Sequence, residues 1–590
     1  MTQVSCLMHP ASVFFIAAFF MPWFKKINFM KPALVLVPVI AIFQINFLPQ
    51  EFGDVNYLGL DLIFGRVDKL SYVFLNVFTL MSLIAGIYSS YVDEWEQHTA
   101  ALLYAGSSLG VTLAGDYLTL FVFWELMAFS SVFLIWYRKK RRSHKAGLRY
   151  LIVHATGGLI LLAGILIRYS EVGNFLFTPI APETATFGDY LIMIGFMLNA
   201  AVPPIHAWLA DAYPEASVIG AVYMCAYTTK TAVYVLARGF AGFEALVILG
   251  AIMALYGVFY AVIENDARRI LAYHIVSQVG YMVCAVGIGT TMAINGACAH
   301  AYAHILYKAL LFMGVGSVLE MTGKSKLSEL GGLYSRMPIS LILTVIGGIA
   351  ISGFPLTSGF ISKSMIVTAA GEDHRIFIML MLLLASVGTF LSVGIKLPYF
   401  IWFHKEKPSV PDAKEAHLPM IGGMCIAAFF CIMMGFYPDY LYNMLPYEVT
   451  YHPYTMYHLS ETLQIIGFTG LGFYLMRKKL VPEDKLNLDI DWIYRKASNP
   501  FKNFCGGPLS KLNDIAGEVY KTIGTRSAML FAKAMSWFDW NGIDYVIDGS
   551  AKETLNLGNR VRMLTTGKIQ HYIGAAVIVL FAVLIIIVLV

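Results

Sequence analysis

Ionisable side chains lie in the middle of apolar runs at several points of the 590-residue chain. Glu125 lies within FVFWELMAF, and Lys230 lies within YTTKTAVYV. A charge inside a bilayer is costly, and such residues usually mark a path for ions. Because burial disfavours the charged form of both groups, a glutamate–lysine pair at mid-membrane can hold or release one proton as nearby charges change. A purely structural role is the weaker interpretation of both residues.

A second group of titratable residues follows helical spacing. His300, His304 and Lys308 in AHAYAHILYKALLF are four residues apart, which places them on one face of one helix. Histidine titrates near neutrality and suits a proton relay. Hydrogen bonding between packed helices is the alternative role of this stripe.

Five further candidates are Lys363, Lys396, His206, Asp211 and His274. Lys363 follows the sequence GFPLTSGFIS, and Lys396 lies late in its apolar segment. Either lysine could instead extend its amine to the membrane surface. The other three lie near segment ends, where a structural or capping role stands open beside transport.

Membrane helices must position these residues. A bilayer core needs about 20 apolar residues per helix. Sixteen segments meet that need: 4–24, 31–48, 70–90, 99–115, 117–137, 149–168, 187–210, 217–238, 243–263, 270–289, 292–319, 338–370, 376–403, 418–437, 463–477 and 570–590. The expected fold class is all-α integral membrane, and no strands are evident.

Two of the segments are interrupted by helix-breaking residues. These are Pro203 and Pro204 in 187–210, and Gly353, Pro355 and Gly359 in 338–370. A broken helix is tolerated in a membrane only where protein or a water-filled cavity satisfies the freed backbone groups. Both segments are therefore predicted to lie against an interior site.

Composition excludes several classes of protein. The chain is 58% hydrophobic and 13% charged, whereas about a quarter of the residues of a soluble domain are charged. Its net charge of +5 is small for a nucleic-acid binder. The seven cysteines form no C-x-x-C pair, and no P-loop or dinucleotide motif occurs. We expect no cofactor, no metal site and no catalytic constellation in this chain.

The loops indicate an orientation. Lysine and arginine gather after odd-numbered segments, whereas the even-numbered loop 438–462 has neither. The positive-inside rule then places the odd loops in the cytoplasm and both termini outside. Segment 4–24 could be a signal peptide, but no basic stretch precedes its apolar run, so we expect a retained helix.

Residues 478–569 differ from the rest because charges return. Over 509–537, apolar residues recur at helical spacing with charged residues opposite them, which predicts an amphipathic helix that begins after a break at 506–508. Thirty residues of helix are about 45 Å long. A second helical stretch is expected over 550–565. The segment is either an interfacial linker or a strut across neighbouring subunits.

Several motifs carry a family resemblance over about residues 60–440. They are FVFWEL around Glu125, PPIHAWLADAYPEA (203–216), DARRILAYHIVSQVGYM (266–282), AHAYAHILYKALLFMGVGSV (299–318) and GFPLTSGFISK (353–363). The chain resembles the antiporter-like subunits of respiratory complex I, the D and A subunits of Mrp-type cation/proton antiporters, and membrane subunits of energy-converting hydrogenases. Its tail, with LDIDWIYRK (488–496), WFDWNGIDYVIDG (537–549) and TGKIQHY (566–572), resembles the end of the largest complex I antiporter-like subunit, which favours the strut.

The resemblance implies two inverted five-helix repeats, each with a broken helix as its fourth member. The expected divisions are 1–98 (N-terminal helices), 99–238 and 243–403 (the repeats), 418–477 (additional helices), 478–569 (a lateral segment on the cytoplasmic side) and 570–590 (a final span). Glu125 matches the family's key glutamate, Lys230 a lysine or histidine of the eighth helix, and Lys363 the lysine after the second break. The stripe of His300, His304 and Lys308 matches the central axis.

One position departs from the family. Asn199 stands nine residues before Trp208, where relatives usually carry a lysine, and it cannot carry a proton charge. An arginine and an aspartate of the sixth helix in some relatives are replaced by Ala155 and Gly158. Either Lys230 partners Glu125 directly, or the first half-channel, which is the ion path through the repeat 99–238, is impaired.

The expected function is proton or Na⁺/H⁺ translocation by one subunit of a larger complex in a prokaryotic cell membrane. Its expected partners are lipid, antiporter-like and small hydrophobic membrane subunits, and a redox module if the complex is of that type. The alternative is a structural subunit that scaffolds its neighbours through the tail.

Overall fold

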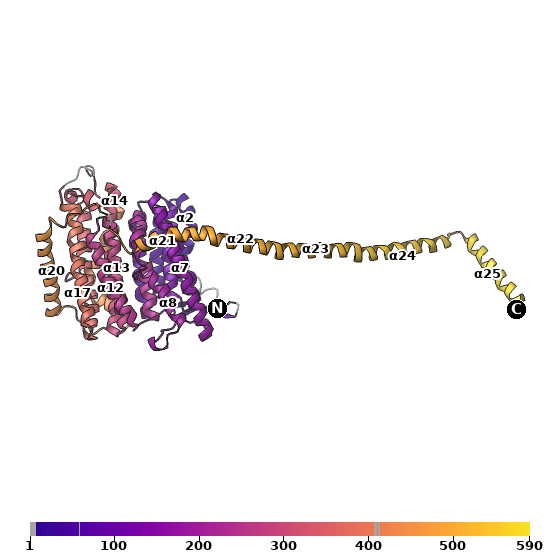
Figure 1. The fold of residues 1–590 in the computed structure, drawn as a ribbon, viewed down its shortest axis with the longest axis horizontal. Coiled ribbons are helices and arrows are strands. Elements are labelled where there is room, and N and C mark those ends of the chain that lie inside the picture. Colours follow the sequence, from indigo (N-terminus) through magenta and orange to yellow (C-terminus); the bar gives the residue numbers. More distant parts are fainter. Residues whose placement is uncertain (1–7, 58, 406–409, 411–412, 486, 590) are drawn as a thin grey trace. The chain divides into compact units, whose positions relative to one another are not determined.

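The computed structural model describes residues 8–57, 59–405, 410, 413–485 and 487–589. It contains two compact units, residues 1–490 and residues 491–590. Residues 4–7 of the first predicted segment lie outside the described residues. The first unit is a bundle of helices that runs from α2 to α20 (Figure 1).

The bundle begins with α2 (Pro10–Lys26), α3 (Met30–Ile45) and α4 (Lys69–Ser89). Helix α2 packs along α5, and Phe14 and Met21 on α2 are fully buried. One face of α2 therefore packs into the bundle, whereas Phe19 and Trp23 on the same helix are exposed.

The expectation of no strands was wrong in one place. β1 (Glu51–Tyr57) and β2 (Leu60–Arg66) form an antiparallel hairpin in the connection between α3 and α4. Phe52 pairs with Gly65, and the phenyl ring of Phe52 occupies the space that a Cβ at position 65 would need. These strands carry charged residues at several positions, so they do not stand out among the apolar runs.

Two successive series of helices follow. The first is α5 (Trp95–Leu113), α6 (Tyr117–Trp136), α7 (Arg141–Val172), α8 (Phe187–Asn199), α9 (Ala207–Ala212), α10 (Val218–Met224) and α11 (Thr228–Gly239). The second is α12 (Glu244–Ile263), α13 (Ala267–Ile288), α14 (Thr291–Thr322), α15 (Pro338–Ser352), α16 (Ser358–Glu372) and α17 (Ile376–Thr389), which the π-helical turns η5 (Phe390–Lys396) and η6 (Tyr399–Phe403) follow. Short 3₁₀ turns are η1 (Pro182–Thr184), η2 (Tyr213–Glu215), η3 (Leu327–Glu329) and η4 (Leu333–Ser335).

The two predicted breaks are present, and a third was missed. The helix stops after Asn199 and resumes at Ala207, and it stops after Ser352 and resumes at Ser358. Segment 217–238, predicted as one helix, is divided between α10 and α11 at residues 225–227. No proline or glycine marks this third break in the sequence.

The two series repeat one another at an offset of 150 residues. Asp116 caps α6 and forms an isolated backbone β-bridge with Leu176. In the same way, Asp266 caps α13 and forms an isolated backbone β-bridge with Lys326. Helices α7 and α14 begin at residues 141 and 291, each has 32 residues, and each ends at a glycine with positive φ. The same caps, lengths and bridges indicate one supersecondary unit used twice.

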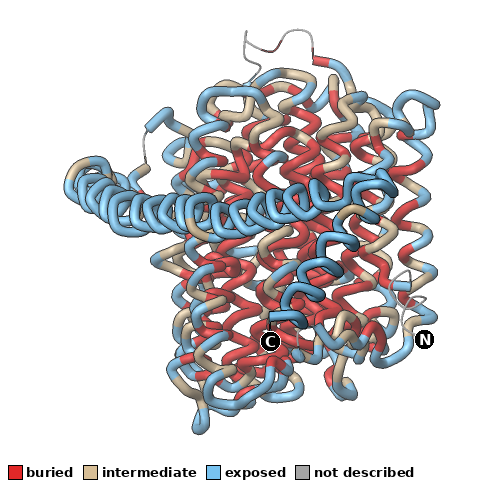
Figure 2. The backbone as a smooth tube through the Cα atoms, turned by 90° about the vertical axis from the view of Figure 1, so that its right-hand side faces the viewer, coloured by how far each residue is buried: buried red, intermediate tan, exposed pale blue. Residues whose placement is uncertain are grey.

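Helices α18 (Leu418–Phe436), α19 (Asp439–Tyr442) and α20 (Met456–Met476) complete the first unit. Helix α20 begins earlier than the predicted segment 463–477 and so includes Glu461. Buried residues fill the interior of the bundle (Figure 2). The core of the unit is centred on α13, which is buried along almost its whole length, and on α14, which is buried from Ala293 to Val318. Polar groups on these two helices therefore lie inside protein.

A helix of the structure overlaps each of the sixteen predicted segments. Within the described residues, nine helices are long and apolar enough to cross a membrane: α4, α6, α7, α12, α13, α14, α18, α25 and the helix from Ile376 to Phe403. The chain is a multi-pass integral membrane protein.

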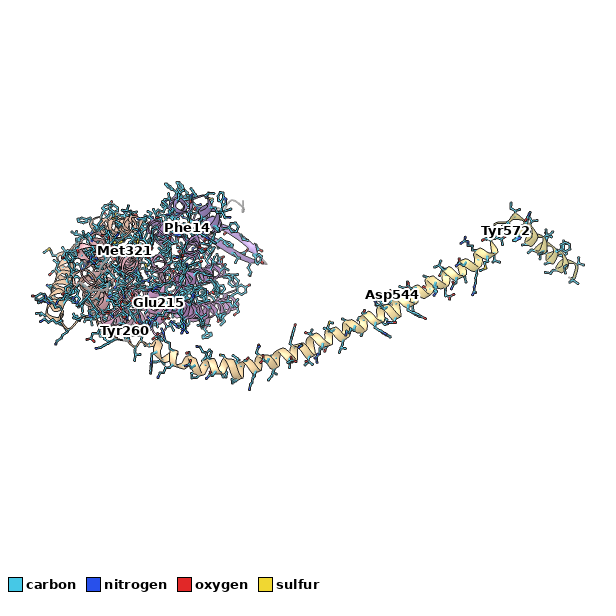
Figure 3. The ribbon with its side chains drawn as sticks, turned by 90° about the horizontal axis from the view of Figure 1, so that it is seen from above. Phe14, Glu215, Tyr260, Met321, Asp544 and Tyr572 are labelled. Atoms are coloured by element: carbon cyan, nitrogen blue, oxygen red, sulfur yellow. The ribbon has the colours of Figure 1, made fainter. Side chains whose placement is uncertain are left out.

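The second unit is helical from residue 491 to residue 564. It contains α21 (Asp491–Phe504), η7 (Cys505–Leu509), α22 (Ser510–Val519), η8 (Tyr520–Arg526), α23 (Ser527–Phe538), η9 (Asp539–Asp544) and α24 (Tyr545–Leu564), and then α25 (Ile569–Leu589). The break predicted at 506–508 was wrong, because those residues form the π-helical turn η7 that joins α21 to α22. At about 1.5 Å per residue the helix is about 110 Å long, and side chains such as Asp544 project from it (Figure 3).

Candidate ion pathway

Lys230 lies at the unpredicted break between α10 and α11. Its amine donates to the main-chain oxygen of Cys225 at 2.6 Å and to Thr229 Oγ1 at 3.0 Å, and the side chain is fully buried. Cys225 ends α10, so its carbonyl is one of those that a helix end leaves without a partner. The lysine therefore satisfies the backbone that the break exposes.

Lys363 occupies the same kind of position at the break between α15 and α16. Its amine donates to the main-chain oxygen of Ile351 at 2.9 Å and lies 5.3 Å from the centre of the Tyr281 ring. The next residue towards the break, Ser362, contacts His300 Nδ1 through its hydroxyl at 3.0 Å. The second broken helix thus meets the stripe on α14.

The stripe on α14 forms a buried polar line. His300 Nε2 lies 3.2 Å from Gln278 Oε1 and 3.3 Å from the Tyr307 hydroxyl. The His300 and His304 rings are 6.3 Å apart between centroids, and the Lys308 amine lies 3.4 Å from the main-chain oxygen of Leu271. His300, His304 and Lys308 lie four residues apart within the single helix α14, so they share one of its faces, and all three side chains are fully buried.

Lys230 joins this line from the first series of helices. It interacts electrostatically with His304 and with Lys308. Helix α11, which carries Lys230, packs against both α13 and α14. Lys230, His300, His304 and Lys308 therefore share one interior region, which extends to Lys363. We call these five residues the interior line.

Glu125 lies apart from Lys230. It is half-buried on α6, and its Oε1 atom is buried without a hydrogen-bond partner among the described residues. That oxygen fills the space that a side chain at Gly158 on α7 would occupy. In the part of the chain that the structure describes, no hydrogen bond or ion pair joins Glu125 to Lys230, whose amine is turned to Cys225 and Thr229 instead.

His154 is a polar residue near Glu125 that the sequence interpretation missed. It lies on α7 one turn before Gly158, and it interacts with the Asn199 side chain at the first break. Its ring is buried against Tyr150 and Trp208, with centroids 4.1 Å and 4.5 Å away. The signal was available, because HATGG lies in an apolar run, but His154 is near neither a proline nor another titratable residue that stood out.

Hydroxyl groups lie between His154 and Lys230. The Tyr150 hydroxyl contacts Ser131 Oγ at 2.8 Å, and it also interacts with Thr228. Thr228 Oγ1 lies 2.6 Å from the Tyr104 hydroxyl, and the next residue, Thr229, accepts from Lys230. A series of polar groups therefore runs from the α6–α7 side to the interior line.

Three of the remaining candidates have structural contacts. Lys396 donates to the main-chain oxygens of Val262 at 2.6 Å and Glu264 at 2.9 Å, at the end of α12. Asp211 accepts from Arg149 in a two-pronged ion pair, at 2.6 and 2.9 Å. His274 Nε2 lies 2.6 Å from Ser392 Oγ on η5, next to the interior line.

His206 follows the first break, after Pro203 and Pro204, and faces an aspartate from the start of the tail. His206 Nε2 lies 3.3 Å from Asp489 Oδ1, and the Tyr273 hydroxyl donates to Oδ2 at 2.7 Å. Tyr256 also donates to this carboxylate, and Tyr260, labelled in Figure 3, donates to the main-chain oxygen of Leu488 at 3.0 Å. These contacts hold residues 488–489 against α12 and α13.

The charge on Asp489 is stabilised by the same groups. Burial alone would raise the pKa of its carboxyl, but the facing His206 ring and the hydrogen bonds from the two tyrosines outweigh burial. The pKa of Asp489 is held well below its ordinary value. The carboxylate therefore stays ionised at neutral pH.

A small cavity beside Lys363 brings in a second acidic residue that was missed. Gly353 and Pro355 mark the break next to it, and its lining includes Gly353, Lys363, Ser386 and Glu461. Glu461 comes from the first turns of α20, which the hydropathy pattern placed outside the membrane segment. An acid and a lysine share this cavity at the far end of the interior line.

Comparisons with known proteins relate the chain to one family of membrane proteins. Residues 114–392 match the family described as NADH:quinone oxidoreductase/Mrp antiporter, transmembrane. An uncharacterized protein of Methanocaldococcus jannaschii is 27% identical over 451 residues, covering 71% of this chain and 91% of that protein. A Na⁺/H⁺ antiporter subunit A1 of Staphylococcus haemolyticus is 30% identical over 421 residues, covering 64% of this chain. The chain spans 52% of that subunit's length.

Two solved structures share the fold. The Mrp complex from Dietzia sp. contains a chain that matches with a TM-score of 0.68 at 20% identity, covering 80% of this chain and 99% of that one. The archaeal membrane-bound sulfane sulfur reductase contains a chain that matches with a TM-score of 0.66 at 23% identity and the same two coverages.

Proposed function

Since residues 114–392 match the transmembrane region of the NADH:quinone oxidoreductase/Mrp antiporter family, we propose that the chain is a proton-translocating subunit of a multi-subunit membrane complex. The observation that carries the proposal is the buried line of titratable groups from Lys230 through His304, Lys308 and His300 to Lys363. Charges are costly inside a membrane, so the charged residues found there usually serve transport or pair with one another. None of the four lysines and histidines after Lys230 in this line forms an ion pair with a carboxylate among the described residues.

Each half of the path contains a helix break. The freed carbonyls of Cys225 and Ile351 accept from Lys230 and Lys363. A lysine amine held by carbonyl oxygens can give up a proton and stay hydrogen-bonded as a neutral group. Lys230 and Lys363 can therefore each release a proton without leaving the carbonyl oxygen that holds the amine.

Two inverted repeats, 99–238 and 243–403, form the proposed architecture, and the 150-residue offset of caps and bridges supports the repetition. We further propose sixteen membrane spans, with odd loops in the cytoplasm, both termini outside and the lateral segment on the cytoplasmic side. The concentration of Lys and Arg in odd loops supports this orientation. The bacterial and archaeal sources of the matching proteins support a prokaryotic cell membrane.

The proposed partners are other membrane subunits, including antiporter-like and small hydrophobic ones, together with either a redox module or a Na⁺ exchange partner. Large apolar side chains on the long helix, including Leu512, Ile523 and Trp537, are more than half exposed in the chain alone. A surface of this kind is typical of a protein interaction site.

Replacing Glu125 with Gln tests the proposal. The variant keeps the size of the side chain but cannot release a proton, so dye-reported acidification of inverted native-membrane vesicles should fall at least about 100-fold. Acidification is started either with a NaCl pulse or with the electron donor of a copurifying redox module, whichever gives a signal with the wild-type complex. Glu244→Gln is the matched control, since Glu244 forms a surface ion pair with Arg375.

A scaffold role is the second candidate, and Asn199 favours it, because an amide stands where the resemblance predicts a lysine. A fully assembled Glu125→Gln complex with wild-type acidification would support this role and overturn the proposal. Dependence of the signal on Na⁺, with no redox subunit in a pull-down, would identify cation exchange as the drive.

A further inference from the structure

His154 has an unusual environment for a structural histidine. It is 1% exposed, and neither of its ring nitrogens has a hydrogen-bond partner among the described residues. A buried polar group without a partner destabilises the folded protein. His98, which is also buried, instead places Nε2 2.9 Å from the main-chain oxygen of Val92. The environment of His154 calls for a function or an internal water molecule.

His154 lies close to both Glu125 and Asn199. The family resemblance implies that the residue at position 199 is the partner of the glutamate. On α7 it lies four residues before Gly158, so both share one helix face. The Glu125 carboxylate lies against Gly158, and the Asn199 side chain lies close to His154 without meeting the geometry of a hydrogen bond. Among the described residues no hydrogen bond joins Glu125 Oε1 to the His154 ring, and one water molecule can link two polar groups that do not touch directly.

Neighbouring side chains fix the ring in this place. The His154 ring packs against both Tyr150 and Trp208, which also contact each other. Trp208 Nε1 donates to the main-chain oxygen of Leu198 at 3.0 Å, next to Asn199. The indole therefore ties the histidine to the end of α8, where the first break begins.

The internal repeat gives an independent argument. Helices α7 and α14 begin at residues 141 and 291 and have equal lengths, so His154 occupies the position in α7 that His304 occupies in α14. His304 lies on the interior line, and both of its ring nitrogens likewise lack a hydrogen-bond partner among the described residues. Both halves thus hold an unpartnered histidine at the same place.

We propose that His154 is the proton acceptor for Glu125 and takes the part that the family resemblance assigns to a lysine at the position of Asn199. This inference rests on the proposed function. In the forward step the O–H bond of the Glu125 carboxyl breaks and an N–H bond forms on the His154 ring, through one water molecule. The products are a carboxylate and an imidazolium, and no electron is exchanged. The imidazolium then passes its proton on through the polar groups that lead from Tyr150 to Lys230.

The test compares His154→Gln, Asn199→Lys and the double variant in the intact complex. His154→Gln should lower acidification of inverted vesicles at least about 10-fold with normal assembly, and Asn199→Lys in the same chain should restore most of it. His98→Gln is the control for loss of a buried histidine outside the path. His154→Asn serves as the second variant if the glutamine variant assembles poorly.

A second readout separates proton exchange from packing. The infrared carboxyl band that disappears in Glu125→Gln reports protonation of Glu125 in the purified complex. In His154→Gln the pH midpoint of this band should shift by at least about one unit, and the added lysine should shift it back. Wild-type acidification with an unchanged midpoint would overturn the inference. If Glu125→Gln itself pumped normally, the proposed function would fail first, which keeps the two failures distinct.

Discussion

Three buried lysines among the described residues share one environment at the residue scale. Lys230, Lys363 and Lys396 each donate to a main-chain oxygen at the end of a helix. A helix end leaves its last carbonyls without intrahelical partners and carries partial negative charge. An amine placed there needs no carboxylate to remain buried, so its proton is free to respond to charges nearby.

Sequence alone could identify most of these residues, because a charge inside an apolar run stands out. It could not tell which carbonyl each amine would meet. Nor could it separate Lys396, which caps α12, from Lys363, which adjoins His300 through Ser362. His154 was missed because its importance comes from Asn199 on another helix and from ring nitrogens without a partner among the described residues.

Gly158→Ala is predicted to impair transport without loss of assembly. A methyl group at this position would occupy the place of the Glu125 Oε1 atom, and the flexible glutamate would have to turn away. Acidification of inverted vesicles should fall at least about 10-fold, whereas the amount of complex in a pull-down should match wild type. Gly467→Ala on α20 is the matched control, because open space surrounds that position in the chain. Equal rates in the two variants would contradict the prediction.

At the scale of elements, the breaks divide into those that sequence could predict and one that it could not. Proline and glycine mark the breaks after Asn199 and Ser352. The break at 225–227 has neither residue type, and side chains stabilise it instead, since Lys230 satisfies Cys225 and Tyr104 accepts from the main-chain N–H of Thr228 at 3.0 Å. Only tertiary contacts specify such a break.

Asp489→Asn is predicted to loosen the start of the tail. The amide keeps its shape but loses the charge that His206, Tyr256 and Tyr273 stabilise, so residues 487–490 should exchange amide hydrogens faster, by at least about 10-fold. In the wild type the depressed pKa keeps this anchoring present at neutral pH, and it is lost only as acid protonates the carboxyl below the ordinary aspartate range near about pH 4. Unchanged exchange in the variant would contradict this prediction and show that the contacts of Leu488 with Tyr260 and of Asn487 with Ile263 hold the segment without the charge.

At the scale of the whole molecule, the feature to explain is the long helix of residues 491–564. Its hydrophobic periodicity was predictable, but its continuity was not, because Gly506, Gly507 and Pro508 are ordinary signs of a break. The structure continues through them as η7, and η8 and η9 extend the helix further. The two separate helical stretches that the sequence predicted are therefore parts of one longer helix, which runs from residue 491 to residue 564.

Deleting residues 491–590 should separate folding from assembly. The first unit holds its own core, so the truncated chain is expected to remain in the membrane with a normal melting curve. Loss of the exposed apolar face should reduce recovery of neighbouring membrane subunits in a gentle pull-down at least about 10-fold. Full recovery would indicate that the tail is only an interfacial linker.

Lys230→Gln is the most direct test of the central claim that protons cross the chain along its buried polar line. Lys230 joins the first series of helices to His304 and Lys308, and glutamine can still donate to the Cys225 carbonyl without carrying a proton charge. The measurement is the initial rate of acidification of inverted vesicles, divided by the amount of assembled complex. The account predicts a fall of at least about 100-fold, and a wild-type rate in fully assembled complex would contradict it.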